Sequence, residues 1–264
     1  MIVQMRTVAA ALNVAVAAVL VAGCHASVEP PAKAADITGV QAAAPSAEPV
    51  APQPEVGALF LGGTDAHTCT ASVVHSATQS LILTAAHCLA SGLPVTFAPG
   101  FDDKAAPDDV WTVDAVYLDP RWLANQDPAA DYAFARVSRP SGGTLESVTG
   151  HALTLVSAPK PGRMTVVGYP MGVGGPPIGC DTSARLDSGG YPALRCGGLV
   201  DGTSGAPWIK GSTVFGVTGG HDGGGCQDDI SYSPKFDAAT AALLTRAEAG
   251  GPGDTAPQTF DSDC

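Results

Sequence analysis

The chain has 264 residues, of which 45% are hydrophobic, and its formal net charge is −12 at pH 7. This length and composition suffice for the core of one large domain. The acidic balance argues against nucleic acid as a partner, because a phosphate backbone is bound by a cationic face. The 32 glycines and 22 prolines indicate many turns.

The N-terminal sequence is typical of an export signal. An apolar run from Val8 to Ala22 follows Arg6 and ends in "VAGC" at Cys24. The run is near the upper length of a signal-peptide core and short for a membrane-spanning helix. Its ending resembles the signal of bacterial lipoproteins, which predicts that residues 1–23 are removed and that Cys24 carries lipid. Acyl chains contribute about 0.8 kcal/mol per buried methylene, so the lipid would anchor the protein to a membrane. A plain signal peptide is the alternative.

Residues 25–55 are rich in Ala, Pro and Glu and contain no aromatic residue. Such a segment cannot bury enough apolar surface to fold, and its prolines favour an extended spacer. We therefore expect a linker over residues 24–55, which include the lipidated Cys24, and one folded domain over residues 56–264. A propeptide that is removed during maturation is the alternative for the same segment.

From Val56 onward, short apolar runs rich in β-branched residues alternate with turn signals. Strands are expected at Ala58–Leu61, Thr70–Val74, Leu81–Ala85, Trp111–Leu118, Tyr132–Val137, Met164–Tyr169 and Val214–Thr218. Many short strands without helices between them predict an all-β sandwich or barrel. The segment "PRWLANQDPAAD" (120–131) is expected to be a loop. One late helix is expected, with Asp237 as its cap and Gly250 and Gly251 at its end.

Three short motifs carry candidate catalytic residues. "LTAAHC" (Leu83–Cys88) contains His87, which suits general-base chemistry near neutral pH. "DYAFARV" opens with Asp131, a carboxylate that could fix the tautomer of such a base. "GTSGAP" places Ser204 in a turn that could expose the hydroxyl and gather backbone N–H groups for an oxyanion. Each motif alone is more often structural, as a core histidine, a turn aspartate or a polar loop.

Together and in this order, the motifs resemble the His, Asp and Ser motifs of the chymotrypsin/trypsin superfamily of serine proteases, over about Val56 to Glu248. The order differs from that of α/β-hydrolases, which run Ser, Asp or Glu, His. The resemblance implies two antiparallel six-stranded β-barrels with a C-terminal helix. It implies that His87 is general base and then acid, that Asp131 orients His87, and that Ser204 attacks the scissile carbonyl to form an acyl-enzyme.

The resemblance also assigns the groups around the nucleophile. The N–H groups of Gly202 and Ser204 would form the oxyanion hole. The substrate pocket would be lined by Gly198, Leu199, Thr218, Gly219 and Gly220. Gly198 stands where trypsin-like members carry the aspartate that selects Lys or Arg, which suggests a neutral substrate residue before the scissile bond. Charged residues of the following loop could make the pocket acidic, or favour an acidic substrate residue, but are interpreted as solvated: His221, Asp222, Asp228 and Asp229.

Thr203 departs from the family pattern. The animal enzymes carry an aspartate before the serine, which pairs with a newly freed N-terminus. Thr203 cannot make that ion pair, and "EVGALFLGG" (55–63) is not the corresponding Ile-Val-Gly-Gly start. We therefore expect no N-terminal-insertion switch, and a turn set by local hydrogen bonds and packing. In this the chain is closer to bacterial secreted trypsin-like and glutamyl-endopeptidase-like branches.

Six cysteines remain once Cys24 is set aside, and an export signal implies an oxidising compartment, which favours disulfides. No CxxC pair appears, so neither a metal nor another cofactor is expected. The resemblance implies a disulfide between Cys69 and Cys88. Proximity in the sequence suggests a second disulfide, Cys180–Cys196, and elimination leaves Cys226–Cys264.

These features predict an extracytoplasmic serine endopeptidase that acts as a monomer on protein or peptide substrates. It would be held as a lipoprotein, through Cys24, at the membrane of a bacterial cell surface or periplasm; secretion is the alternative. Two other functions stay open. One is a catalytically inactive, protease-like surface binding lipoprotein, and the other is an esterase that uses the same triad.

Overall fold

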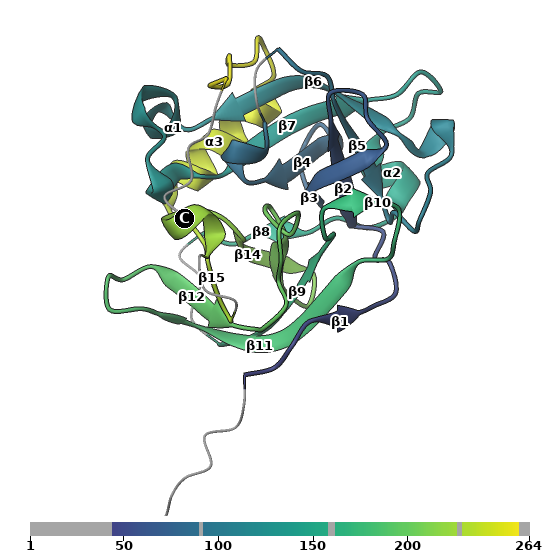
Figure 1. Cartoon of the computed structure of the whole chain (residues 1–264). Coiled ribbons are helices and arrows are strands. Elements are labelled where there is room, and N and C mark those ends of the chain that lie inside the picture. The colour runs from purple at the N-terminus through teal and green to yellow at the C-terminus, as the bar shows by residue number, and fades with distance from the viewer. Residues whose placement is uncertain (1–43, 90–91, 158–161, 226–228, 259–264) are drawn as a thin grey trace, which may run out of the picture. The chain divides into compact units, whose positions relative to one another are not determined.

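The computed structural model describes residues 44–89, 92–157, 162–225 and 229–258 (Figure 1). Most of the regular structure in these ranges is β-strand, and the strands form two sheets. Within the same ranges, no helix combines the length and the apolar character needed to cross a lipid bilayer. The predicted all-β class is therefore confirmed.

The first sheet closes into a barrel of six strands. The strand order is β3-β2-β5-β6-β7-β4, and β4 pairs back with β3, while the short strand β10 (Gly172–Val173) adds to β3. The six strands are β2 (Val56–Leu61), β3 (Ala66–Val74), β4 (Leu81–Thr84), β5 (Val95–Pro99), β6 (Trp111–Leu118) and β7 (Ala133–Ser138). The first of the two expected barrels is thus present.

Strand β4 shows why its first three residues, Leu81 to Leu83, form a continuous apolar run rather than an alternating one. All four residues are buried. Ile82 packs in the core inside the barrel, whereas Leu81 and Leu83 belong to a second cluster that includes Val167 and Val214 of the other sheet. Side chains alternate between the two faces of a strand, so a strand covered on both faces is apolar throughout.

The second sheet stays open. Its order is β15-β12-β11-β9-β13-β14-β8, with β1 added to β11. Its strands are β1 (Glu48–Pro49), β8 (Thr154–Leu155), β9 (Gly162–Gly168), β11 (Ile178–Leu186), β12 (Pro192–Arg195), β13 (Pro207–Lys210), β14 (Thr213–Val217) and β15 (Ile230–Tyr232). The end strands β8 and β15 have 2 and 3 residues. Because these short strands do not pair with each other, the described residues form a half-barrel where a second closed six-stranded barrel was expected.

The folded part also starts earlier than Val56. Residues 45–50 were expected to belong to the linker, but β1 pairs antiparallel with β11, and Ser46 forms a parallel bridge with Gly197. These contacts use backbone groups: the Pro45 carbonyl accepts a hydrogen bond, and the N–H groups of Ala47 and Val50, which are not prolines, donate.

The late helix is confirmed as α3 (Ala238–Ala249), which packs on β6 and β7 (Figure 1). The Asp237 side chain accepts hydrogen bonds from the N–H groups of Ala239 and Thr240, and the chain leaves the helix at Gly250. After α3, Asp254 accepts a hydrogen bond from the Leu118 N–H at 2.7 Å, which ties the tail to β6.

The prediction of a loop over residues 120–131 is wrong, because this segment contains the helix α1 (Pro120–Asn125) and the 3-10 helix η3 (Pro128–Ala130). Asp119 caps α1 and proline occupies its first position, a combination that starts helices. The remaining helices are α2 (Leu145–Thr149), η1 (Ala86–Cys88), η2 (Pro107–Asp109) and η4 (His221–Gly224).

Two of the three predicted disulfides are confirmed, Cys69–Cys88 and Cys180–Cys196. The third predicted pair, Cys226–Cys264, lies outside the described residues, as does the predicted lipidation site Cys24.

A buried carboxylate organises the segment between β6 and β7. Asp119 is 4% exposed, and its oxygens accept hydrogen bonds from the backbone N–H and guanidinium of Arg121 and from the Tyr132 hydroxyl at 2.7 Å. Burial raises the pKa of Asp119, but these hydrogen bonds and the Arg121 charge outweigh it and lower the pKa from 3.8 to about 2. The network fixes the chain on both sides of η3.

This network predicts an acid-sensitive contribution to stability. The pKa of Asp119 is lower in the folded chain than in the unfolded chain, so its contribution is complete above about pH 4 and is lost as the pH falls towards about 2. Replacing Asp119→Asn should therefore lower the free energy of unfolding at pH 7, and the difference from the native protein should shrink at pH 2.5. Urea titrations at both pH values measure this, and a difference that is the same at both would contradict the prediction.

Candidate active site

Asp131 lies fully buried two residues before β7 and directly after η3. One carboxylate oxygen accepts from the His87 backbone N–H at 2.9 Å, and the other accepts from His87 Nδ1 and from the Gly220 N–H, both at 2.7 Å. Burial alone would raise the pKa of Asp131, but the attraction of the His87 ring and these hydrogen bonds lower it below its ordinary value. Asp131 is therefore an ionised carboxylate away from water.

The His87 ring is oriented by that carboxylate. A neutral imidazole that donates from Nδ1 to Asp131 carries its lone pair on Nε2. His87 is part of η1, which follows β4. The disulfide between Cys88 and Cys69 ties the end of η1 to β3. The His87 side chain is 11% exposed. An imidazole held in this way can take a proton from a hydroxyl group.

The same disulfide argues against a metal at this place. In the part of the chain that the structure describes, one group of three potential ligands is close enough to hold an ion, Cys69, His87 and Cys88, with atoms within 4.8 Å of one another. The two sulfur atoms are bonded to each other and cannot act as thiolate ligands. These residues therefore fit a disulfide beside a histidine rather than a metal centre.

The turn that carries Ser204 is held by local hydrogen bonds. The Thr203 N–H and hydroxyl both donate to the Val200 carbonyl, at 3.0 and 2.7 Å. Gly202 and Gly205, on the two sides of the turn, have φ values of +93° and +79°, which favour glycine. Thr203 thus stabilises the turn through its own neighbours, as expected from its inability to form an ion pair.

Strand β3 of the first barrel holds this turn from outside through Thr70. The Thr70 N–H donates to the Ser204 carbonyl at 2.8 Å, and its hydroxyl donates to the Gly202 carbonyl at 3.0 Å. The same hydroxyl accepts from the Tyr169 N–H at 2.8 Å. One buried threonine therefore fixes the backbone before and at Ser204.

Gly205 allows the turn to approach the segment that leads to His87. A Cβ atom on Gly205 would lie 2.2 Å from the Thr70 carbonyl oxygen and 3.0 Å from the Ala85 nitrogen. Ala85 directly precedes η1, which contains His87. No larger residue fits at this position, and the Ser204 turn consequently packs against the end of β4.

The other sheet completes the arrangement. The Gly205 N–H donates to the Thr218 carbonyl at 2.7 Å. The next residue, Gly219, lies so close to Asp131 that a Cβ atom there would be 2.9 Å from the carboxylate. The structure therefore brings together the three segments that carry Ser204, His87 and Asp131, and it places His87 and Asp131 in direct contact.

The N–H groups predicted for an oxyanion hole are not used within the turn. The Thr203 N–H donates to Val200, but among the described residues neither the Gly202 N–H nor the Ser204 N–H donates a hydrogen bond. Two backbone donors on either side of one engaged donor can serve an incoming oxygen.

The predicted pocket residues fall in two segments. Thr218, Gly219 and Gly220 run between the Ser204 turn and Asp131, as described above. Gly198 and Leu199 belong to the segment that follows Cys196, and Leu199 packs on the core of the second sheet. The first segment thus leads to the Asp131 carboxylate, and the second leads to the turn that carries Ser204.

The loop charges are partnered. The His221 ring stacks on Tyr191 and meets Tyr232 edge-on, with both centroids at 4.9 Å, and its Nε2 lies 3.6 Å from Asp222. Asp229 pairs with Arg195 at 2.7 Å, and Asp228 lies outside the described residues. An acidic or basic pocket gains no support from these side chains.

Sequence reasoning missed three contributors to the site. Thr70, Thr84 and the N–H group of Gly220 were not assigned, although Thr84 belongs to "LTAAHC" and its hydroxyl donates to the Thr70 carbonyl at 2.7 Å. The threonines between buried apolar residues could have been noticed, since buried hydroxyls need partners. The Gly220 N–H leaves no sequence signal.

The arrangement of strands matches solved serine proteases. Protease Anisep from Arthrobacter nicotinovorans aligns with a TM-score of 0.68 and 24% identity, covering 77% of this chain and all of its own. A thermostable serine protease, AL20, from an extremophilic microorganism aligns with a TM-score of 0.66 and 23% identity, covering 75% of this chain and 99% of its own. Human heparin binding protein shares the fold at a TM-score of 0.55 and 16% identity, covering 80% of this chain and 99% of its own.

A search of curated proteins found no match. A family model, in contrast, does match the sequence. The family model described as trypsin-like peptidase domain matches residues 69–226, which contain His87, Asp131 and Ser204 and make up more than half of the chain. The chain therefore belongs to the trypsin-like peptidase family.

Proposed function

We propose that the protein is a serine endopeptidase in which His87, Asp131 and Ser204 form the catalytic triad. The observation that carries the proposal is the buried Asp131 carboxylate, which binds His87 through Nδ1 while the Ser204 turn packs beside the same segment. An oriented histidine beside a serine-bearing turn supports acyl transfer by an activated hydroxyl.

In the proposed reaction, His87 Nε2 takes the proton from the Ser204 hydroxyl as the oxygen attacks the scissile carbonyl carbon. Asp131 stays ionised and stabilises the imidazolium that forms. His87 then gives the proton to the leaving amine, and the peptide C–N bond breaks to leave an acyl-enzyme on Ser204. Water, deprotonated by His87, hydrolyses this ester and frees the serine.

The oxyanion of each tetrahedral intermediate would be bound by the N–H groups of Gly202 and Ser204. Support comes from their lack of other acceptors among the described residues and from the local hydrogen bonds that fix Thr203 between them. Donors that are already in position need no reorganisation as negative charge develops.

The substrate in this proposal is a protein or peptide with a neutral residue before the scissile bond. Gly198 offers no charge at the predicted pocket. Among the described residues of the nearby loop, the charged side chains have partners: His221 lies against Tyr191, Tyr232 and Asp222, and Asp229 pairs with Arg195. We further propose an extracytoplasmic location with a lipid on Cys24. The two disulfides support an oxidising compartment.

A binding function is the second candidate, because one protein with the same fold is named for binding heparin. Heparin itself is a poor fit here, since a polyanion is bound by cationic surfaces and this chain has a net charge of −12. A surface binding protein would also have no need for a buried carboxylate that orients a histidine.

A fluorophosphonate probe tests the proposal, because it reacts with an activated serine. We expect one label per native molecule, located at Ser204 by peptide mapping and lost in Ser204→Ala. His87→Ala should slow labelling at least a hundredfold on the scale seen for triad bases.

Absence of labelling in a folded native protein would favour the binding function. Labelling combined with turnover of esters but not of peptides would support an esterase and contradict the endopeptidase.

Thr70 provides a second prediction. Thr70→Val keeps the shape of the side chain but leaves the Tyr169 N–H and the Gly202 carbonyl without their partner. We expect the free energy of unfolding to fall by about 1–3 kcal/mol and kcat to fall about tenfold to a hundredfold as the oxyanion donors shift. Thr70→Ser restores the hydroxyl and should recover most of both losses. A kcat of Thr70→Val equal to that of the native protein would show that the Thr70 hydroxyl does not position the turn.

A further inference from the structure

Residues 45–54 are here called the strap, and its first three residues lie against Gly197 and Gly198, where the segment of the predicted substrate pocket begins. The Gly197 N–H donates to the Pro45 carbonyl, and the Ala47 N–H donates to the Gly197 carbonyl, each at 2.8 Å. These two bonds flank the parallel bridge between Ser46 and Gly197. Both backbone groups of Gly197 are therefore bound by the strap.

The strap also contacts Gly198, the first of the predicted pocket residues. A Cβ atom on Gly198 would lie 3.8–3.9 Å from Ala47 atoms, which is ordinary contact distance. Ala47 and Leu199 pack on the same cluster, which includes the disulfide-bonded Cys180 and Cys196. The pocket segment is thus fixed at its start by a disulfide and along its outer side by the strap.

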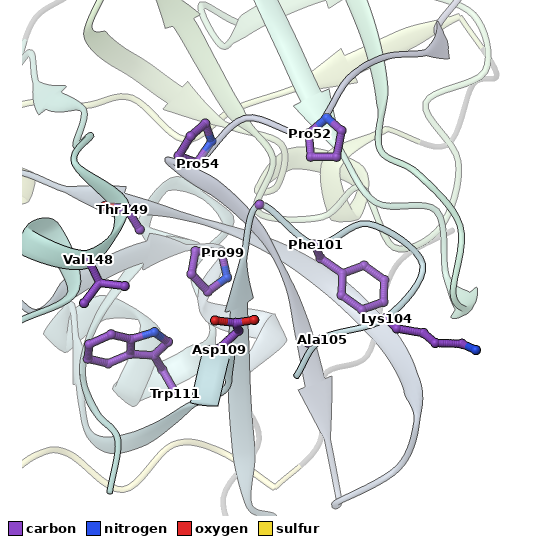
Figure 2. A pocket seen from close by; sticks show the side chains of 11 residues that line it. Pro52, Pro54, Pro99, Phe101, Lys104, Ala105, Asp109, Trp111, Val148 and Thr149 are labelled. Carbon is purple, nitrogen blue, oxygen red and sulfur yellow. The ribbon is translucent and has the colours of Figure 1, made fainter. Parts of the chain in front are cut away.

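Beyond Ala47 the strap is attached to both sheets. Glu48 and Pro49 pair with β11, and the Val50 N–H donates to the Pro177 carbonyl at 2.9 Å. Pro52 and Pro54 then lie over the first barrel, where they line a hollow of about 380 Å³ together with Pro99, Phe101 and Trp111 (Figure 2). The segment does not hang beside the domain but crosses from one sheet to the other.

We propose that the strap positions the substrate pocket, an inference that rests on the proposed endopeptidase function. Gly197 lies seven residues before Ser204. The segment between them contains Gly198 with φ +78° and Val200 with 53% of its surface exposed, so little else covers it from outside. Without the strap, this segment would lose two backbone hydrogen bonds and one packing surface, and the pocket would be less ordered when substrate arrives.

The contacts are made by internal backbone groups and need no free chain terminus. Activity should therefore tolerate any N-terminus upstream of residue 44 and should depend on residues 45–47. Removal of residues 24–43 should leave the pocket intact, whereas a cut or a kink at residues 45–47 should open it.

The test uses the full mature chain with one residue changed. Ala47→Pro removes the N–H that donates to Gly197, and Ala51→Pro is the matched control, because Ala51 is exposed and its N–H makes no hydrogen bond among the described residues. We expect KM for a peptide substrate to rise at least tenfold in Ala47→Pro. The kcat and the rate of labelling by a small fluorophosphonate should stay within about threefold, and the control should match the native protein.

A second variant approaches the contact from the other side. Gly197→Val adds a branched side chain on the side of Gly197 that faces the strap. The Cβ atom of this side chain would lie 3.3 Å from Ser46 Oγ, which is closer than ordinary contact. The substitution leaves the strap sequence unchanged, so the same rise in KM would come from the loss of the contact and not from a misfolded N-terminal segment. Hydrogen exchange of the amides of residues 196–202 should become faster in both variants.

Unchanged KM and unchanged exchange in both variants would overturn the proposal. So would a parallel loss of Tm, kcat and labelling, because that pattern indicates a general structural role. If the native protein neither cleaves peptides nor reacts with the probe, the proposed function fails. The exchange measurement then still decides whether the strap orders residues 196–202.

Discussion

The buried carboxylate of Asp131 is the interaction on which the rest of the site depends. An unpaired charge in this position would cost several kcal/mol, so its three N–H partners are needed for folding as well as for orientation. Two come from His87 in the first barrel, and the third comes from Gly220, which follows the last long strand of the second sheet. One ionised group therefore holds both halves of the site together, and the orientation of the His87 ring follows from it.

The serine turn is fixed by neutral contacts. Thr203 is bound to Val200 within the turn, while Thr70 binds the turn from the first barrel and Thr218 binds it from the second sheet. Each of these is a hydrogen bond to a backbone group, so the geometry does not depend on a charge or on a newly formed N-terminus. The family's animal members use an ion pair at this position, and here local hydrogen bonds occupy the corresponding place.

The sequence could predict the parts of the molecule that short contiguous motifs specify. The motifs of His87 and Asp131 and the capped helix after Asp237 are specified by neighbouring residues, and the Cys69–Cys88 disulfide followed from the family resemblance that these motifs carry. The half-barrel and the strap could not be predicted, because they depend on which backbone groups meet across long separations. The Ala/Pro composition of residues 45–54 even pointed away from ordered structure. The helix at 120–125 was missed for a different reason, since the Asp119–Pro120 start signal was present and was overlooked.

Ser204 is proposed here as the nucleophile of a peptide-cleaving enzyme. The most direct test of this role is N-terminal profiling of a proteome-derived digest, in which the native protein and Ser204→Ala are incubated with the same mixture. New N-termini should appear only with the native protein, and the residues before the cleaved bonds should be predominantly neutral. If the two samples show the same N-termini, or if neither shows any new ones, Ser204 is not the nucleophile of an endopeptidase.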